Sequence, residues 1–172
     1  LNCFYAQGQF IPNADFENYT SCPAALSELS KCSSWLQPTS GTTDYYNCSF
    51  YTNGFLSGAP SSGSGVIGLW SITSSVVANY YGEYAKANLI TPLKKDSTYC
   101  ISFDAMYDSD FFSFFGATIN SCVDFGIYIY NDTAVLPILG GASGIYDVNA
   151  QAATNSSNIL INTYKTFSYT YT

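Results

Sequence analysis

The segment Thr98-Tyr-Cys-Ile-Ser-Phe-Asp-Ala-Met-Tyr107 gives the clearest indication of the fold. Side chains of a β-strand point alternately to its two faces, so every second residue of this segment shares a face. One face is predicted to carry Tyr99, Ile101, Phe103, Ala105 and Tyr107, and the other to carry Cys100, Ser102, Asp104 and Met106. This alternation is typical of a half-buried strand.

A second run, Val123–Tyr130, alternates in the same way. Its apolar face would carry Val123, Phe125, Ile127 and Ile129, and its opposite face Asp124, Tyr128 and Tyr130. We expect this run to be the antiparallel neighbour of the first. Cys100 and Cys122 lie at the edges of the two runs, so a disulfide between them could close the long excursion that separates them.

The composition favours one β-rich domain. The chain has 172 residues, including 16 Tyr and 12 Phe, which is enough for one substantial core, and its composition shows no break. We predict a single domain over residues 7–172, preceded by a short N-terminal segment, residues 1–6. The alternation stops abruptly at Thr172, which suggests that the domain is truncated at its C-terminus.

The charge excludes several classes of function. The formal net charge is −7, and the five basic residues are all lysines, at positions 31, 86, 94, 95 and 165. So few cations cannot neutralise a run of phosphates, which argues against nucleic acid as a partner. The chain has no histidine, so the common catalytic triads and most zinc sites are also excluded.

The six cysteines indicate an oxidising compartment. They are even in number and form no CxxC pair, which favours disulfides over a metal site, with buried free thiols as the alternative. The opening residues, Leu1–Ala6, resemble the end of a secretory signal, although a lipid-modified Cys3 is a second interpretation. No apolar run reaches the roughly 18 residues that a membrane-spanning helix needs.

The rest of the chain reads as short strands separated by turns. Residues Ser21–Lys31 are the one segment predicted to be helical, for one to three turns. Strands are expected over Ala14–Glu17, in the aromatic segment that ends at Cys48, and over residues 66–72, 83–89, 159–161 and 166–171. About eight short strands favour a β-sandwich or a barrel.

Several motifs together resemble the jelly-roll modules of secreted and outer-surface proteins of Bacteroidetes, of the galactose-binding-like or carbohydrate-binding type. The motifs lie within residues 11–130: Ile11-Pro-Asn-Ala-Asp-Phe-Glu17, Ser21-Cys-Pro23, Trp35-Leu-Gln-Pro-Thr-Ser-Gly-Thr-Thr-Asp-Tyr-Tyr-Asn47, Gly65-Val-Ile-Gly68, Tyr81-Gly-Glu-Tyr84, Leu89-Ile-Thr-Pro-Leu93 and Tyr99-Cys-Ile-Ser-Phe103. The resemblance implies an all-β, antiparallel jelly-roll β-sandwich. With this fold we expect one short helix and two or three disulfides, pairing Cys100 with Cys122 and Cys22 with Cys48.

Two acidic groups are candidates for cation binding or catalysis. Asp15 and Glu17 match acidic positions that in carbohydrate-binding jelly rolls often help to hold a structural calcium ion; the alternative is a solvated acidic edge. Asp104, Asp108 and Asp110 could bind a cation or supply a carboxylate for glycan hydrolysis, and a solvated loop is the simpler interpretation.

Aromatic residues supply the candidate ligand site. Flat rings flanked by amides and carboxylates stack on sugars, which singles out Trp35, Asp44, Tyr45, Tyr46 and Asn47. The alternative is that most of these rings belong to the core. Four phenylalanines within five residues cannot all point inward from one strand, so an interface is predicted at Phe111, Phe112, Phe114 and Phe115.

These observations predict a secreted or surface-displayed binding module for glycan, without catalysis and without any cofactor apart from calcium. The first alternative is a structural or adhesive protein of the cell surface. It would bind a surface protein, or assemble into oligomers, through exposed aromatics and an open sheet edge. A carboxylate-dependent glycoside hydrolase is the third hypothesis.

Overall fold

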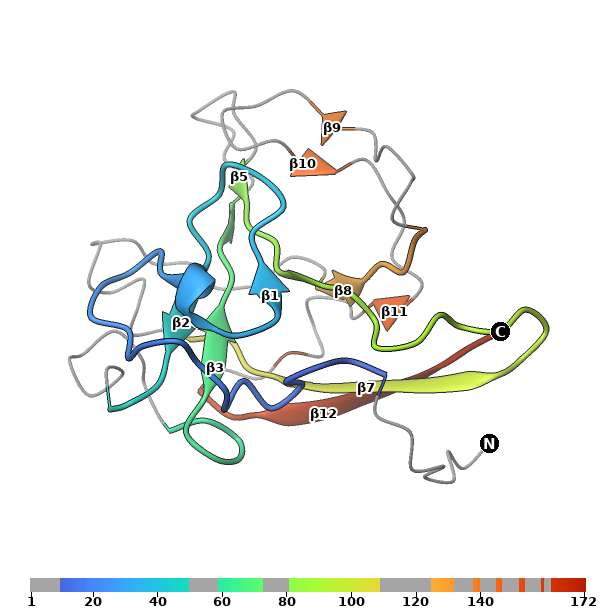
Figure 1. The fold of residues 1–172 in the computed structure, drawn as a ribbon, viewed down its shortest axis with the longest axis horizontal. Helices are drawn as coiled ribbons and strands as arrows, with labels where there is room; N and C mark the ends of the chain where they lie inside the picture. The colour runs from blue at the N-terminus through green and yellow to red at the C-terminus, as the bar shows by residue number, and fades with distance from the viewer. Residues whose placement is uncertain are drawn as a thin grey trace.

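The structure is a computed structural model that describes residues 10–49, 59–72, 81–108, 125–131, 138–139, 145–146, 152–153, 159 and 162–172. In this part of the chain the regular structure is a single-turn 3-10 helix and a series of mostly short strands (Figure 1). In chain order the elements are η1 (Leu29–Lys31), β1 (Trp35–Leu36), β2 (Asp44–Tyr46), β3 (Val66–Gly68), β4 (Ser71–Ile72), β5 (Tyr81–Gly82), β6 (Lys86–Ala87), β7 (Tyr99–Ala105), β8 (Gly126–Ile127), β9 (Ile138–Leu139), β10 (Ile145–Tyr146), β11 (Ala152–Ala153) and β12 (Lys165–Tyr171).

All the described strand pairs are antiparallel. They form six ladders of two strands each: β1 with β6, β2 with β3, β4 with β5, β7 with β12, β8 with β11 and β9 with β10. The predicted all-β, antiparallel class is therefore confirmed. The two-layer jelly-roll arrangement stays a prediction, because each of these ladders is only two strands wide.

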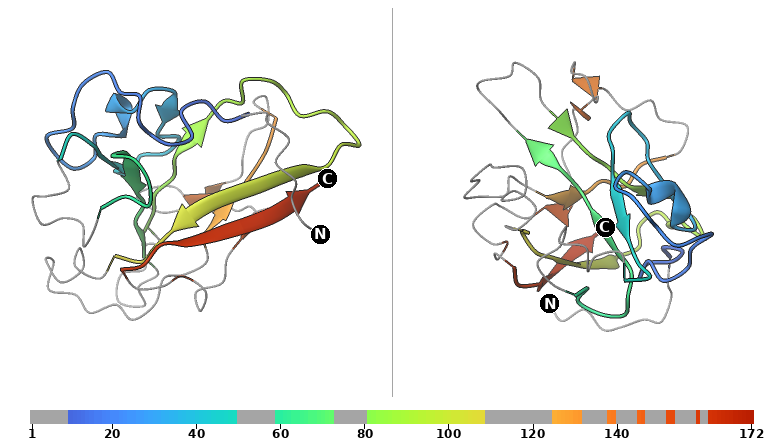
Figure 2. Two further views of the ribbon diagram at one scale, coloured as in Figure 1. Left: turned by 90° about the horizontal axis from the view of Figure 1, so that it is seen from below. Right: turned by 90° about the vertical axis from the view of Figure 1, so that its left-hand side faces the viewer.

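The longest ladder joins β7 to β12, the last strand of the chain. Its register runs from Tyr99 opposite Tyr171 to Ala105 opposite Lys165. The two strands lie side by side as one extended ribbon in Figure 1 and in the left panel of Figure 2. Burial alternates along both strands, as period two requires. The predicted inner face of Tyr99–Tyr107 is thus confirmed.

Two clusters form the described core. The two-stranded ribbon formed by β7 and β12 covers one cluster. This cluster contains buried Tyr107, Ile159 and Phe167, with Phe103, Ala105, Phe125 and Tyr169 packed against them. The other cluster lies among η1 and strands β1 to β3, with buried Leu29, Cys32 and Tyr45 and with Phe16, Trp35, Ile67 and Ala85 packed around them. Each cluster draws on segments far apart in the sequence.

The predicted pairing of Val123–Tyr130 with β7 is wrong for the part of this run that is described. Gly126 and Ile127 pair with β11 instead, while β7 pairs with β12. Phe125 still contacts the ribbon, since its ring centroid lies 5.3 Å from that of Phe103. Alternation defines the two faces of a strand, but it carries no information about which strand lies beside it.

Two local predictions near the N-terminus also need correction. Helical structure within Ser21–Lys31 is limited to η1, because Ser27 has a positive φ of 66°, which an α-helix does not tolerate. Ala14–Glu17 forms a turn and not a strand, with a positive φ of 60° at Phe16. The Phe16 ring nevertheless packs inward on the core, as predicted.

The cysteines are only partly paired in the way that was predicted. The Cys22–Cys48 disulfide is present, with Cα atoms 5.7 Å apart. Cys100 is also in a disulfide, but its predicted partner Cys122 lies outside the described residues. Cys32 is a buried free thiol, so it takes part in none of the two or three disulfides that were predicted. This thiol fills space in the N-terminal core as a small apolar group.

Candidate functional site

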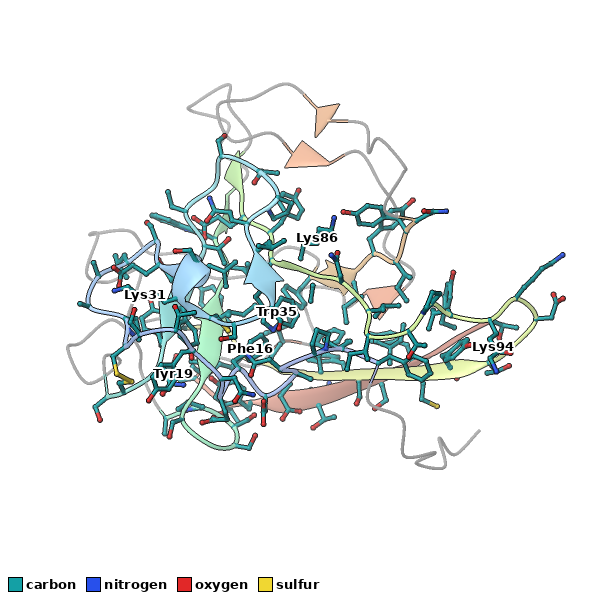
Figure 3. All side chains as sticks on the ribbon, viewed as in Figure 1. Phe16, Tyr19, Lys31, Trp35, Lys86 and Lys94 are labelled. Atoms are coloured by element: carbon teal, nitrogen blue, oxygen red, sulfur yellow. A yellow bond between two sulfur atoms is a disulfide. The ribbon has the colours of Figure 1, made fainter. Side chains whose placement is uncertain are left out.

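The residues predicted to bind sugar lie mainly inside the protein. Tyr45 and Tyr46 are 0% and 1% exposed, and Asp44 and Asn47 are buried with them. The half-buried ring of Trp35 packs on Phe16, with centroids 5.0 Å apart (Figure 3). Burial removes Tyr45 and Tyr46 from the rings that could stack on a ligand. All three residues of β2 are buried, so both of its faces are covered. A strand buried on both faces shows no alternation of apolar and polar residues, and the sequence therefore did not reveal that these side chains are internal.

Internal hydrogen bonds hold these side chains in place. Tyr45 Oη donates to the carbonyl of Phe16 at 2.8 Å, and Asn47 Nδ2 donates to Tyr45 Oη at 2.9 Å. Asp44 accepts from the backbone amide of Ser27 at 2.6 Å and from Tyr46 Oη at 3.2 Å. The network joins β2 to the preceding loops, which is a structural role.

Glu83 is a buried carboxylate that the sequence analysis did not single out. It accepts hydrogen bonds from the amide and hydroxyl of Thr42, at 3.1 and 2.6 Å, and from the amide of Trp70 at 2.8 Å. Burial, and then the nearby charge of Glu83, raise the pKa of Asp44 to about 6. Both carboxylates accept from internal donors, so this pair joins segments of the fold.

The two acidic residues proposed for calcium lie close in sequence but have different roles. Glu17 Oε1 accepts from the amides of Ser64 and Gly65, at 2.6 and 2.7 Å, and so anchors the loop before β3. Asp15 is exposed, and its carboxylate accepts from the amide of Glu17 at 3.5 Å. Among the described residues, no group of three or more acidic, cysteine or histidine side chains is arranged to hold a metal ion. Calcium binding stays a prediction.

The second acidic group is described only in part. Asp104 lies on the exposed face of β7, where it accepts from the hydroxyls of Ser61 and Thr166 at 2.8 and 2.6 Å. Asp108 is half-buried. Asp110, the third carboxylate of this group, lies outside the described residues. The predicted interface lies outside them as well, at Phe111, Phe112, Phe114 and Phe115.

A different aromatic surface is exposed, at the end of β8. Tyr128 and Tyr130, two residues apart on one face, stack with ring centroids 6.0 Å apart and planes inclined by 22°. Tyr128 is 36% exposed. The ammonium group of Lys86, from β6, lies 5.4 Å from the centroid of the Tyr130 ring, which is a cation–π contact. We call these three residues the tyrosine platform.

An open hollow lies beside the β1–β6 ladder, to which Lys86 of the platform also belongs. Its volume is about 300 Å³, and it is lined by Pro12, Ser34, Leu36 and Asn88. Leu36 is the cross-strand partner of Lys86, so their side chains share a face of the β1–β6 ladder. Asn88, which also lines the hollow, follows Lys86 by two residues and lies just after β6. Lys86 of the platform thus lies across the ladder from Leu36, which lines the hollow.

The sequence analysis placed Tyr128 and Tyr130 on the outer face of their run, but it did not bring Lys86 to them. No signal in the sequence links positions more than 40 residues apart in this way.

No family model, curated protein or solved structure matches this chain. The described part of the chain contains no helix that is long and apolar enough to span a membrane.

Proposed function

We propose that this protein is a non-catalytic binding module for glycan, secreted or displayed at the cell surface, and that the tyrosine platform is its binding site. The observation that carries the proposal is the stacked pair formed by exposed Tyr128 and half-buried Tyr130. A planar ring covers the apolar C–H face of a pyranose while the sugar hydroxyls stay free for hydrogen bonds. The predicted function is kept, and its site moves away from the buried β2 residues.

The surroundings of the platform support this assignment. Ser34 and Asn88 line the hollow beside the β1–β6 ladder and supply a hydroxyl and an amide, which can both donate and accept hydrogen bonds. Leu36 adds an apolar surface beside them. Binding sites for small ligands combine apolar contact with a few polar groups in this manner.

The scaffold supports an extracellular location. A disulfide between Cys22 and Cys48 persists in an oxidising environment, as in secreted proteins. A net charge of −7 keeps such a chain soluble and works against binding to polyanions. The jelly-roll sandwich that the sequence motifs resemble remains part of this proposal, as does the resemblance to galactose-binding-like modules.

Glycan binding to purified protein tests the proposal. Wild-type protein is screened against neutral and acidic oligosaccharides, and hits are measured by calorimetry. Replacing Tyr128 by Ala should weaken binding about tenfold, because an aromatic contact worth roughly 1.5 kcal/mol is lost.

The matched control is Tyr19→Ala. Tyr19 is 44% exposed and lies well apart from Lys86 in Figure 3. Equal losses in the two variants, or no binding of any glycan by the wild-type protein, would count against the proposal.

A further inference from the structure

We infer that the tyrosine platform binds one sugar residue at a time, so that a single pyranose supplies the contact whatever the length of the glycan that carries it. The inference rests on the proposed function and adds the size of the bound unit to it. It follows from the stacked arrangement of Tyr128 and Tyr130, whose ring centroids lie 6.0 Å apart with planes inclined by 22°.

The stack leaves too little room for a sugar between the two rings. Carbon atoms in van der Waals contact lie about 3.5–4.0 Å apart, so a pyranose held between two ring faces would need those faces roughly 7–8 Å apart. The observed distance between the centroids of Tyr128 and Tyr130 is shorter, at 6.0 Å. The facing surfaces of the two rings are therefore used by the stack itself, and a ligand contacts a surface that points outward.

Tyr128 offers the more accessible outward surface. Its side chain is 36% exposed, whereas Tyr130 is half-buried. The ammonium group of Lys86 lies 5.4 Å from the centroid of the Tyr130 ring and so already occupies space over that ring. A phenol and a pyranose are both six-membered rings, so one tyrosine face covers one sugar residue. We therefore place the bound sugar on the outer face of Tyr128, with Tyr130 and Lys86 supporting it from behind.

An extended site would need further rings in a row, one for each additional stacked residue. Among the described residues, the other exposed aromatic side chain is Tyr19, which is 44% exposed and lies well apart from Lys86 in Figure 3. The described residues that line the hollow beside the β1–β6 ladder are not aromatic: Pro12, Ser34, Leu36 and Asn88. The described surface thus supplies one stacking position.

The dependence of affinity on chain length distinguishes one position from several. A second position that contributed about 1.4 kcal/mol would tighten binding tenfold, and a third would do so again. With one position, a chain of identical residues gains only from having more residues that can occupy it. The affinity of a chain should then rise by no more than the number of its residues.

The test measures binding of the purified protein to galactose, β-1,4-galactobiose and β-1,4-galactohexaose, with glucose, cellobiose and cellohexaose in parallel. NMR titration suits ligands of this size because it detects weak binding. The dissociation constant should improve by at most about sixfold from the monosaccharide to the hexasaccharide. Tyr128→Ala should weaken binding of both by the same factor, about tenfold, because both use the same ring. Tyr128→Phe is the matched control; it keeps the ring and should bind like wild type.

The outcomes separate the inference from the function on which it rests. A hexasaccharide that binds about a hundredfold more tightly than its monosaccharide would overturn the single-residue site and leave glycan binding intact. Equal losses in Tyr128→Phe and Tyr128→Ala would also overturn the inference, since the ring face would then not be the contact. Binding of none of these sugars, by protein whose near-ultraviolet circular dichroism shows a folded core, would overturn both the inference and the proposed function.

Discussion

Phe103 of β7 stacks on Phe167 of β12, with ring centroids 5.5 Å apart and planes inclined by 25°. The two residues are direct cross-strand partners in the longest ladder of the structure. Phe167 is buried, and its ring belongs to the cluster beneath the ribbon. This contact ties the last strand of the chain to the strand that gives the clearest sequence signal.

Phe167→Ala should therefore destabilise the protein strongly. Truncating a buried phenylalanine loses apolar burial and leaves a cavity, which together cost about 3 kcal/mol or more. Urea denaturation followed by tyrosine fluorescence measures the change in the free energy of unfolding. Ser168→Ala, at the next and exposed position of β12, should change it by no more than about 0.5 kcal/mol. Similar values for the two variants would contradict the burial pattern of this strand.

The buried carboxyl of Asp44 should make the protein more stable at mildly acidic pH. Its pKa is raised to about 6, from an ordinary value of 3.8. Because the folded state binds this proton more tightly than the unfolded state does, the free energy of unfolding should rise as the pH falls from 7 towards 5. The gain from Asp44 is about 1 kcal/mol. Asp44→Asn should flatten the pH dependence in this range, and an unchanged profile would argue against the assignment.

The trend should reverse at lower pH because of Glu28. Its hydrogen bond from Lys31, together with bonds from the amides of Ala24 and Ala25, lowers the pKa of its carboxyl to about 2. The folded state then binds this proton less tightly than the unfolded state, so the stabilisation is present above about pH 4.5 and is lost as the pH falls towards 2. In Glu28→Gln the acid limb of the stability profile should be shallower. Thermal unfolding between pH 2.5 and 5 measures it, and a limb as steep as that of the wild type would rule out this role.

Removing the Cys22–Cys48 disulfide should lower stability through the unfolded state. The bridge joins residues 26 apart, and opening a loop of that size costs about 3 kcal/mol in the chain-entropy account. The double variant Cys22→Ala/Cys48→Ala is preferable to chemical reduction, because Cys100 is also in a disulfide. Ser21→Ala, next to the bridge, is the control. The midpoint of urea denaturation should fall in the double variant. An unchanged midpoint would show that the bridge does not constrain the unfolded chain.

The thiol of Cys32 should be inert in the folded protein. Burial raises its pKa to about 11, so the reactive thiolate is scarce at neutral pH. A maleimide should not label Cys32 under native conditions but should label it in denaturant without reductant, as peptide mapping would detect. Rapid labelling of the native protein at this position would mean that the core around Leu29 and Tyr45 opens readily.

The sequence alone predicted the features that depend on local geometry. The two faces of Tyr99–Ala105 follow from the fixed period of a strand, and the same rule put Tyr128 on an outer face. The bridge between Cys22 and Cys48 was also anticipated. The strand faces were read from residue type and spacing, whereas the bridge was expected with the fold that the motifs resemble.

Only the tertiary structure decided which strands and side chains meet. It paired β7 with β12, covered both faces of Tyr45 and Tyr46, and brought Lys86 to Tyr130. The direction in which a side chain points from a strand is set by its own backbone, whereas its neighbours and its burial depend on contacts between distant segments. Those contacts leave no periodic trace in either segment, so here the location of the candidate site depended on the folded chain.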